Sequence, residues 1–214
     1  MVCSLNCFCD FLEADTSVRR ATVIQRYKRR STSSIRGRSV YYRPVLRIIR
    51  GTLCPNGAME EKIAALKEAC VRSTCSNKLN DARIAANMRV FNAFRSEFGN
   101  KKVETFSNPR MQFLAIDDLA INIQPELYAK VDGVQMIWKF GLCKDSRPEH
   151  IVRAILQMLA KATKQKGIDL PISHVRFLDT MSGHVYVEND PDNTIEKELR
   201  LKAKAFADLW ENRN

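Results

Sequence analysis

Glu126 and Lys139 are the two residues of this 214-residue chain whose types and spacing best suit site chemistry. They lie in the stretch 119–143, LAINIQPELYAKVDGVQMIWKFGLC, where two apolar-rich runs flank Asp132-Gly133. A two-residue Asp-Gly loop between such runs favours the type I′ turn of a tight β-hairpin. In that register Glu126 faces Lys139, and opposed side chains on one face of a hairpin lie about 5 Å apart at Cβ. The spacing therefore predicts an acid and a lysine in contact.

A pair of this kind has two interpretations. A cross-strand ion pair can simply fix the register of the hairpin. Alternatively, the carboxylate can hold a metal ion while the lysine positions a water molecule or stabilises charge on a phosphate. The sequence leaves both interpretations open, and the second needs a further acid near Glu126.

The elements that must position this pair follow from hydrophobic periodicity. Apolar residues recur at helical spacing in five segments, 17–30, 59–71, 80–98, 147–166 and 194–210. Strand-like runs outside the hairpin occupy 111–116, 119–123, 175–178 and 184–187. Helices before and after groups of strands predict an α/β or α+β fold, a mixed β-sheet flanked by helices.

Positive charge is concentrated near the N-terminus. Between residues 17 and 51 there is no Asp or Glu, and the eleven basic residues are Arg19, Arg20, Arg26, Lys28, Arg29, Arg30, Arg36, Arg38, Arg43, Arg47 and Arg50. The rest of the chain has 24 basic and 24 acidic residues, so this segment accounts for the net charge of +11. Such a segment suits a polyanion, and we expect these residues to bind nucleic acid. The alternative is a solvated pair of helices that keeps the protein soluble.

Seven cysteines, an odd number without a regular framework, indicate reduced thiols and a cytoplasmic protein. Cys3, Cys7 and Cys9 form a C-x3-C-x-C cluster that could begin a zinc site with Cys54. Structural zinc sites usually show paired C-x2–4-C units, so free thiols at a loose terminus are the alternative. The N-terminus lacks the pattern of a signal peptide, and no apolar run reaches the length of a transmembrane helix, so we expect no membrane association.

The hairpin and its neighbours resemble the PD-(D/E)xK nuclease superfamily, whose core is a helix, three strands, a helix and a fourth strand. Pro125-Glu126 resembles the first half of the motif and Ile137-Trp138-Lys139 the second half. Three segments, FLEADTSVRRATVIQRYKRR, PELYAKVDGVQMIWKFGL and FLDTMSGHVYV, are similar to an uncharacterised bacterial family with such a core. The charge pattern predicts a basic helical N-terminal arm over 1–58, and the resemblance implies a restriction-endonuclease-like core over 59–214.

In that superfamily two acids hold Mg²⁺, so the resemblance implies Mg²⁺ as cofactor, with Glu126 and Lys139 as catalytic residues. Glu126 would be a metal ligand, and Asp179 is a candidate second ligand. Ile137 replaces the second acid of the motif and cannot coordinate a metal. Further candidate acids for the missing position are Glu97, Asp117 and Asp118.

Other site chemistries lack a pattern in the sequence. His150, His174 and His184 show no metal-ligand spacing, and the chain has neither a G-x4-G-K-[ST] nor a G-x-G-x-x-G loop, so no small-molecule cofactor is expected. The sequence therefore predicts a nucleic-acid-binding protein on a nuclease-like core, with Mg²⁺-dependent phosphodiester hydrolysis if the site is active. The alternative is a non-catalytic scaffold whose basic arm binds an acidic protein.

Overall fold

A computed structural model describes residues 1–32, 41–52, 59–71, 77–106 and 113–211. The helices are α1 (Leu5–Glu13), α2 (Ser17–Thr32), α4 (Arg43–Thr52), α5 (Met59–Val71), α6 (Asn77–Phe98), α7 (Glu149–Gln165), α8 (Asn193–Glu211) and the 3-10 turn η1 (Ile172–His174). The strands are β1 (Val2–Ser4), β2 (Val103–Thr105), β3 (Leu114–Ile116), β4 (Leu119–Asn122), β5 (Leu127–Val131), β6 (Val134–Gly141), β7 (Val175–Asp179) and β8 (Val185–Val187). The predicted mixture of helices and strands is confirmed.

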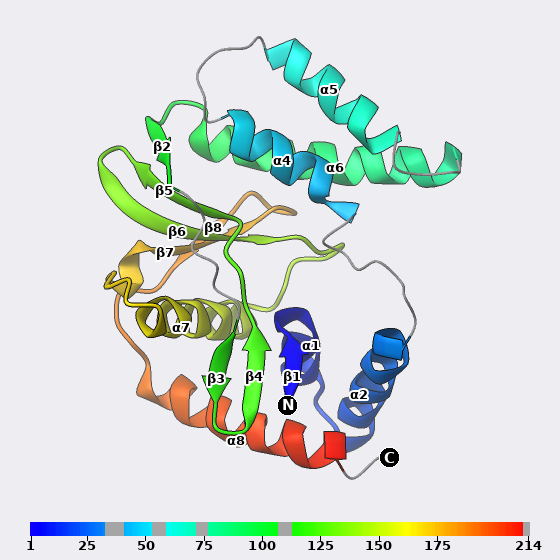
Figure 1. The fold of residues 1–214 in the computed structure, drawn as a ribbon, viewed down its shortest axis with the longest axis vertical. Coiled ribbons are helices and arrows are strands. Elements are labelled where there is room, and N and C mark those ends of the chain that lie inside the picture. Colours follow the sequence, from blue (N-terminus) through cyan, green and yellow to red (C-terminus); the bar gives the residue numbers. More distant parts are fainter. Residues whose placement is uncertain (33–40, 53–58, 72–76, 107–112, 212–214) are drawn as a thin grey trace.

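The elements form layers around a five-stranded sheet (Figure 1). Helices α4, α5 and α6 cover one face of this sheet, and α7 covers the other. Beyond α7 lie a three-stranded sheet and the helices α1, α2 and α8. No helix among the described residues is long and apolar enough to cross a membrane.

The five-stranded sheet has the order β2-β5-β6-β7-β8. Strands β6 and β7 are parallel, and the other neighbours in this sheet are antiparallel. Because parallel strands need a crossover, α7 connects β6 to β7 across one face of the sheet. The carboxyl ends of β6 and β7 therefore meet at one edge, the position where α/β sheets commonly place binding sites.

The predicted hairpin is confirmed in its register. Val131 pairs with Val134 and Tyr128 with Ile137. Asp132 and Gly133 occupy the turn with φ of 48° and 87°, the positive values that a type I′ turn requires. Local turn chemistry was sufficient to predict this element.

Parts of the predicted runs 111–116 and 119–123 form the strands β3 and β4, but outside the sheet that contains the hairpin, and residues 111 and 112 lie outside the described ranges. They pair with each other, and β4 also pairs in parallel with β1. The first strand of the five-stranded sheet is instead β2, which was not predicted because three residues are too few to show periodicity.

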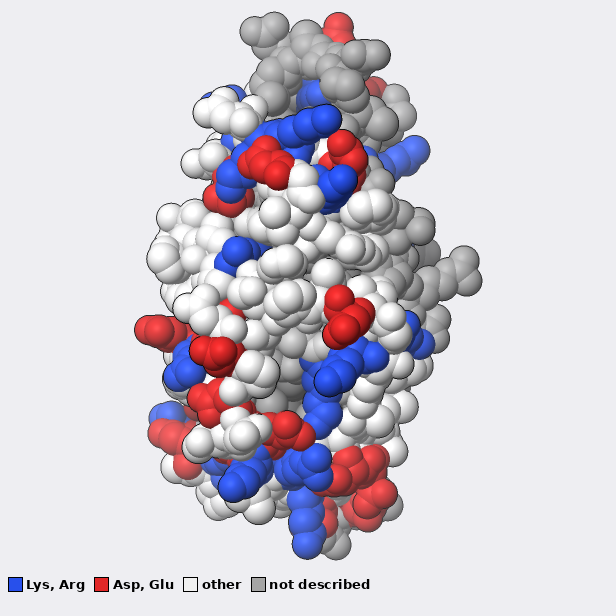
Figure 2. Space-filling view, turned by 90° about the vertical axis from the view of Figure 1, so that its left-hand side faces the viewer, with Lys and Arg blue, Asp and Glu red and all other residues white. Residues whose placement is uncertain are grey.

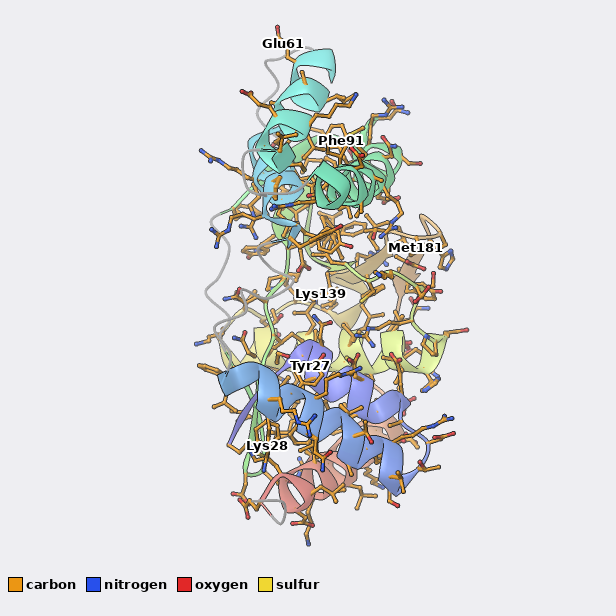
Figure 3. The ribbon with its side chains drawn as sticks, turned by 90° about the vertical axis from the view of Figure 1, so that its right-hand side faces the viewer. Tyr27, Lys28, Glu61, Phe91, Lys139 and Met181 are labelled. Carbon is orange, nitrogen blue, oxygen red and sulfur yellow. The ribbon has the colours of Figure 1, made fainter. Side chains whose placement is uncertain are left out.

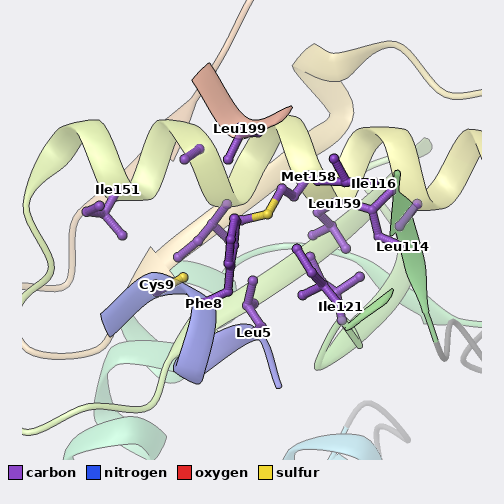
Figure 4. Close-up of a cluster of buried hydrophobic side chains, with 14 of the residues drawn as sticks. Leu5, Phe8, Cys9, Leu114, Ile116, Ile121, Ile151, Met158, Leu159 and Leu199 are labelled. Atoms are coloured by element: carbon purple, nitrogen blue, oxygen red, sulfur yellow. The ribbon is translucent and has the colours of Figure 1, made fainter. Parts of the chain in front are cut away.

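The two hydrophobic clusters of the molecule take residues from both sides of position 58. One cluster joins β1, α1 and α2 to α7, α8 and the three-stranded sheet, and Phe8 and Met158 lie within it (Figure 4). The other joins α4 to α5, α6 and the opposite face of the hairpin. The described parts of segment 1–58 are thus packed into the globule and share its cores.

Candidate functional site

The Glu126–Lys139 pair forms as the hairpin register predicts. The Glu126 N–H donates to the Trp138 carbonyl at 2.9 Å, which extends the β5–β6 ladder to this residue. Lys139 Nζ then lies 2.7 Å from Glu126 Oε1, with exposed side-chain fractions of 15% and 10%. Figure 3 shows Lys139 between the layer of α4 and α6 above and α2 below. The pair is therefore nearly buried between two helical layers.

Internal hydrogen bonds occupy both oxygens of the Glu126 carboxylate. Oε1 accepts from Lys139, and Oε2 accepts from the Phe140 N–H at 2.8 Å. Lys139 also donates to the Gln124 carbonyl at 2.8 Å. Since an ammonium group has three N–H donors, these bonds leave Lys139 one further donor for a ligand. The geometry fits a lock on the hairpin register, the first of the two interpretations.

The candidate second acid, Asp179, is engaged in a different task at the end of β7. Its carboxylate accepts from the Met181 N–H and the Ser182 hydroxyl, both at 2.9 Å, and from the Ser146 hydroxyl. Burial raises the pKa of Asp179, but these hydrogen bonds outweigh it and hold the pKa below the ordinary value of 3.8. Asp179 therefore organises the turn between β7 and β8.

The residues present do not fit the Mg²⁺ site that the nuclease resemblance implies. Ile137, in the place of the motif's second acid, is completely buried against α7. Glu97 pairs with Lys101, and Asp117 occupies the β3–β4 turn with a φ of 46°. Within the described ranges, no group of three or more His, Cys, Asp or Glu residues could hold a metal ion.

The N-terminal cysteines are buried thiols and belong to a folded element, whereas the sequence suggested a loose terminus. Cys3, Cys7 and Cys9 lie in β1 and α1 within the hydrophobic cluster. Burial raises the pKa of Cys3 and of Cys9 to about 12, and it raises the pKa of Cys7 as well. Since the thiolate is the metal-binding form, this environment disfavours a zinc site. Cys54, the suggested fourth ligand, lies outside the described residues.

The basic residues of α2 mostly contact the protein itself. Arg19 pairs with Asp15 at 3.1 Å, and Arg26 pairs with Asp10 at 2.7 Å. Arg20 donates to the Ala14 carbonyl and lies over the Phe11 ring. Lys28 donates to the Trp210 carbonyl and lies over the Trp210 ring, and Arg29 also interacts with another part of the protein. Among them, Arg20 and Arg26 fasten α2 to α1, and Lys28 fastens it to α8. The side chains of Arg30, Arg36 and Arg38 lie outside the described set.

Helix α4 presents its arginines differently. Arg43, Arg47 and Arg50 are exposed, and their spacing of four and three residues places them on one face, here called the α4 arginine stripe. Nothing in the described part of the chain forms an ion pair with them. The opposite face of α4 is buried through Val45 and Ile49.

The α4 arginine stripe leads to the Glu126–Lys139 pair. Arg50 Nε donates to the Glu126 carbonyl at 3.3 Å, so the C-terminal end of α4 lies against the start of β5. The Lys139 side chain itself is on the face of the sheet that α7 covers, together with Ile137, whereas α4 covers the opposite face. Of the predicted basic residues on α4, Arg50 therefore contacts the backbone of the hairpin beside the Glu126–Lys139 pair.

Sequence reasoning missed the residue that holds the start of α4. Asn87 on α6 is completely buried, its Oδ1 accepts from the Val45 N–H at 3.2 Å, and its Nδ2 donates to the Tyr41 carbonyl at 3.1 Å. It therefore caps a helix from outside that helix. The available signal was a lone asparagine on the apolar side of segment 80–98, which usually means a buried polar group with a specific partner.

Comparisons with protein-family models, with curated proteins and with solved structures find no match to this chain.

Proposed function

We propose that this protein binds nucleic acid along the α4 arginine stripe. The observation that carries the proposal is the set of three exposed arginines on one face of a helix, none of which forms an ion pair with the described residues. Elsewhere acids offset the charge: in the lower half of the face in Figure 2, Lys and Arg alternate with Asp and Glu. A stripe of one sign is the electrostatic footprint of a phosphate-binding surface.

The order of elements supports a nuclease-like core as the scaffold. Helix α6, strands β2, β5 and β6, helix α7 and strand β7 follow one another in the order of the PD-(D/E)xK core, with β3 and β4 inserted after β2. Pro125-Glu126 precedes the second of these strands, and Lys139 lies on the third. On this proposal the scaffold is retained for binding, because the Glu126 and Asp179 carboxylates serve structural hydrogen bonds.

The test is fluorescence anisotropy with labelled duplex and single-stranded DNA and RNA, titrated with the whole chain at several salt concentrations. Each phosphate contact releases counterions, so the logarithm of the affinity should fall linearly with the logarithm of the salt concentration. A flat salt response, or no binding to any of the four probes, would refute the proposal.

Catalysis is tested separately with the same nucleic acids and added Mg²⁺. We expect no cleavage, because Glu126 already serves Lys139 and Phe140. Mg²⁺-dependent cleavage that is lost in Glu126→Ala and in Lys139→Ala would show that the pair is an active site. In that case binding would stand and the non-catalytic assignment would be wrong.

A further inference from the structure

A groove separate from the α4 arginine stripe lies between α6 and the turn that joins β7 to β8. It has a volume of about 450 Å³, and its described lining includes Met88, Arg89, Asn92, Ser96, Met181 and Ser182. In Figure 3, Met181 and α4 lie on opposite sides of α6. Pockets that bind small molecules commonly have volumes of about 300–1,000 Å³. The groove is open to solvent, so a ligand of nucleotide size would lie in it with one side exposed.

Arg89 gives this groove a positive charge that the described residues do not neutralise. Its Nη2 donates to the Cys143 carbonyl at 3.0 Å, and the guanidinium also interacts with the Tyr42 hydroxyl. Its Nε is buried without a hydrogen-bond partner, and no carboxylate in the described ranges pairs with it. Because a guanidinium has five N–H donors, the bonds to Cys143 and Tyr42 leave donors on its terminal nitrogens with which an anionic group would form charge-assisted hydrogen bonds.

The wall opposite α6 is rigid before any ligand binds. Asp179 holds the turn through the Met181 N–H and the Ser182 hydroxyl, and the Gly183 N–H donates to the Asp179 carbonyl at 2.8 Å. Gly183 adopts a φ of 76°, a conformation that favours glycine. A preorganised wall lowers the entropic cost of binding.

We propose that this groove binds a phosphorylated small molecule of nucleotide size. The guanidinium of Arg89 takes the phosphate through the terminal N–H donors that Cys143 and Tyr42 leave free. Asn92, Ser96 and Ser182 supply polar groups around it, and the thioethers of Met88 and Met181 offer an adaptable surface to a flat ring. This site is independent of the α4 arginine stripe.

The experiment is isothermal titration calorimetry of the whole chain with adenosine 5′-monophosphate, inorganic phosphate and adenosine as separate probes. We expect the monophosphate to bind more tightly than either fragment. Arg89→Met should weaken monophosphate binding by about 10- to 100-fold, the loss expected for a charge-assisted hydrogen bond. Arg95→Met removes an exposed arginine from the same helix outside the groove and should bind like the wild type.

Asn92→Trp tests the groove without altering Arg89. The new side chain fills the space from an exposed position of α6, so it should abolish binding while the melting temperature stays near that of the wild type. This arm decides the matter if Arg89→Met fails to fold. Absence of binding by the wild type up to about 1 mM of monophosphate or phosphate, or binding that survives Asn92→Trp, would overturn the proposal.

Discussion

Replacing Arg43, Arg47 and Arg50 together by glutamine should remove most of the salt dependence of nucleic-acid binding. The three residues span seven positions of α4, which corresponds to about 10 Å along the helix axis. That is the axial length of about three phosphates on one strand of B-form DNA. The stripe can therefore engage about three phosphates at once.

The magnitude follows from counterion release. Three contacts contribute about 2.7 to the slope of log affinity against log salt. Between about 50 mM and about 200 mM salt, those contacts alone account for a loss of affinity of about 40-fold. The triple variant should show a slope smaller by about this amount, measured by anisotropy at four or more salt concentrations.

The matched control removes the same number of charges from α8. Lys197, Arg200 and Lys204 are exposed and also share one helix face, but acidic residues such as Glu196 and Glu198 lie among them. Their triple replacement by glutamine should leave the slope nearly unchanged. Equal losses of slope in the two triple variants would mean that net charge alone drives binding, and the assignment of α4 would be refuted.

Three further predictions concern the site and the core. Glu126→Ala should lower the free energy of unfolding, measured in urea titrations, by about 3–5 kcal/mol, because it leaves the nearly buried Lys139 without its counter-ion. The control Glu104→Ala removes an exposed ion pair of the same sheet and should change this free energy by less than about 1 kcal/mol. Equal effects of the two substitutions would contradict the role of the pair in fixing the hairpin register. Asp179 has a lowered pKa in the folded state, so its contribution to stability is complete above the ordinary value of 3.8 and is lost as the pH falls below that value. Asp179→Asn should therefore make the free energy of unfolding less dependent on pH in the acid range. An unchanged pH dependence would refute this assignment. The buried cysteines Cys3, Cys7 and Cys9 should react slowly with an alkylating reagent in the native protein. At about pH 8 we expect their modification, followed by peptide mass spectrometry, to be more than about 1,000-fold slower than that of a free thiol. Fast modification would show that they are exposed.

The features that could be predicted from the sequence are those governed by local chemistry. Asp132-Gly133 specifies the turn of the hairpin, and because side chains alternate with a period of two, the turn also sets Glu126 opposite Lys139. Helix α7 begins after Pro148 and is followed by Gly167 with a φ of 73°, as the helix-end signals predict. Each of these elements depends on residues close together in the chain.

The features that could not be predicted depend on long-range partners. Nothing in the local sequence distinguishes the strand pair β3–β4 from strands of the hairpin sheet, because the choice depends on the parallel pairing of β4 with β1, more than a hundred residues away. Likewise, composition alone could not separate the arginines of α2 from those of α4. Asp10 and Asp15 form ion pairs with arginines of α2, whereas no described residue forms an ion pair with Arg43, Arg47 or Arg50.

By itself the sequence determined the hairpin, the acid–lysine pair and the concentration of positive charge, since turn preference and residue counts need no tertiary information. The tertiary structure decided what each of these is available to do. Hydrogen bonds from Phe140 and Ser182 turn Glu126 and Asp179 into structural groups, and packing against α6 leaves Arg43 and Arg47 facing solvent. The physical reason is that a charged side chain is available to a ligand only where the fold leaves it without an internal counter-ion and with hydrogen-bonding capacity to spare.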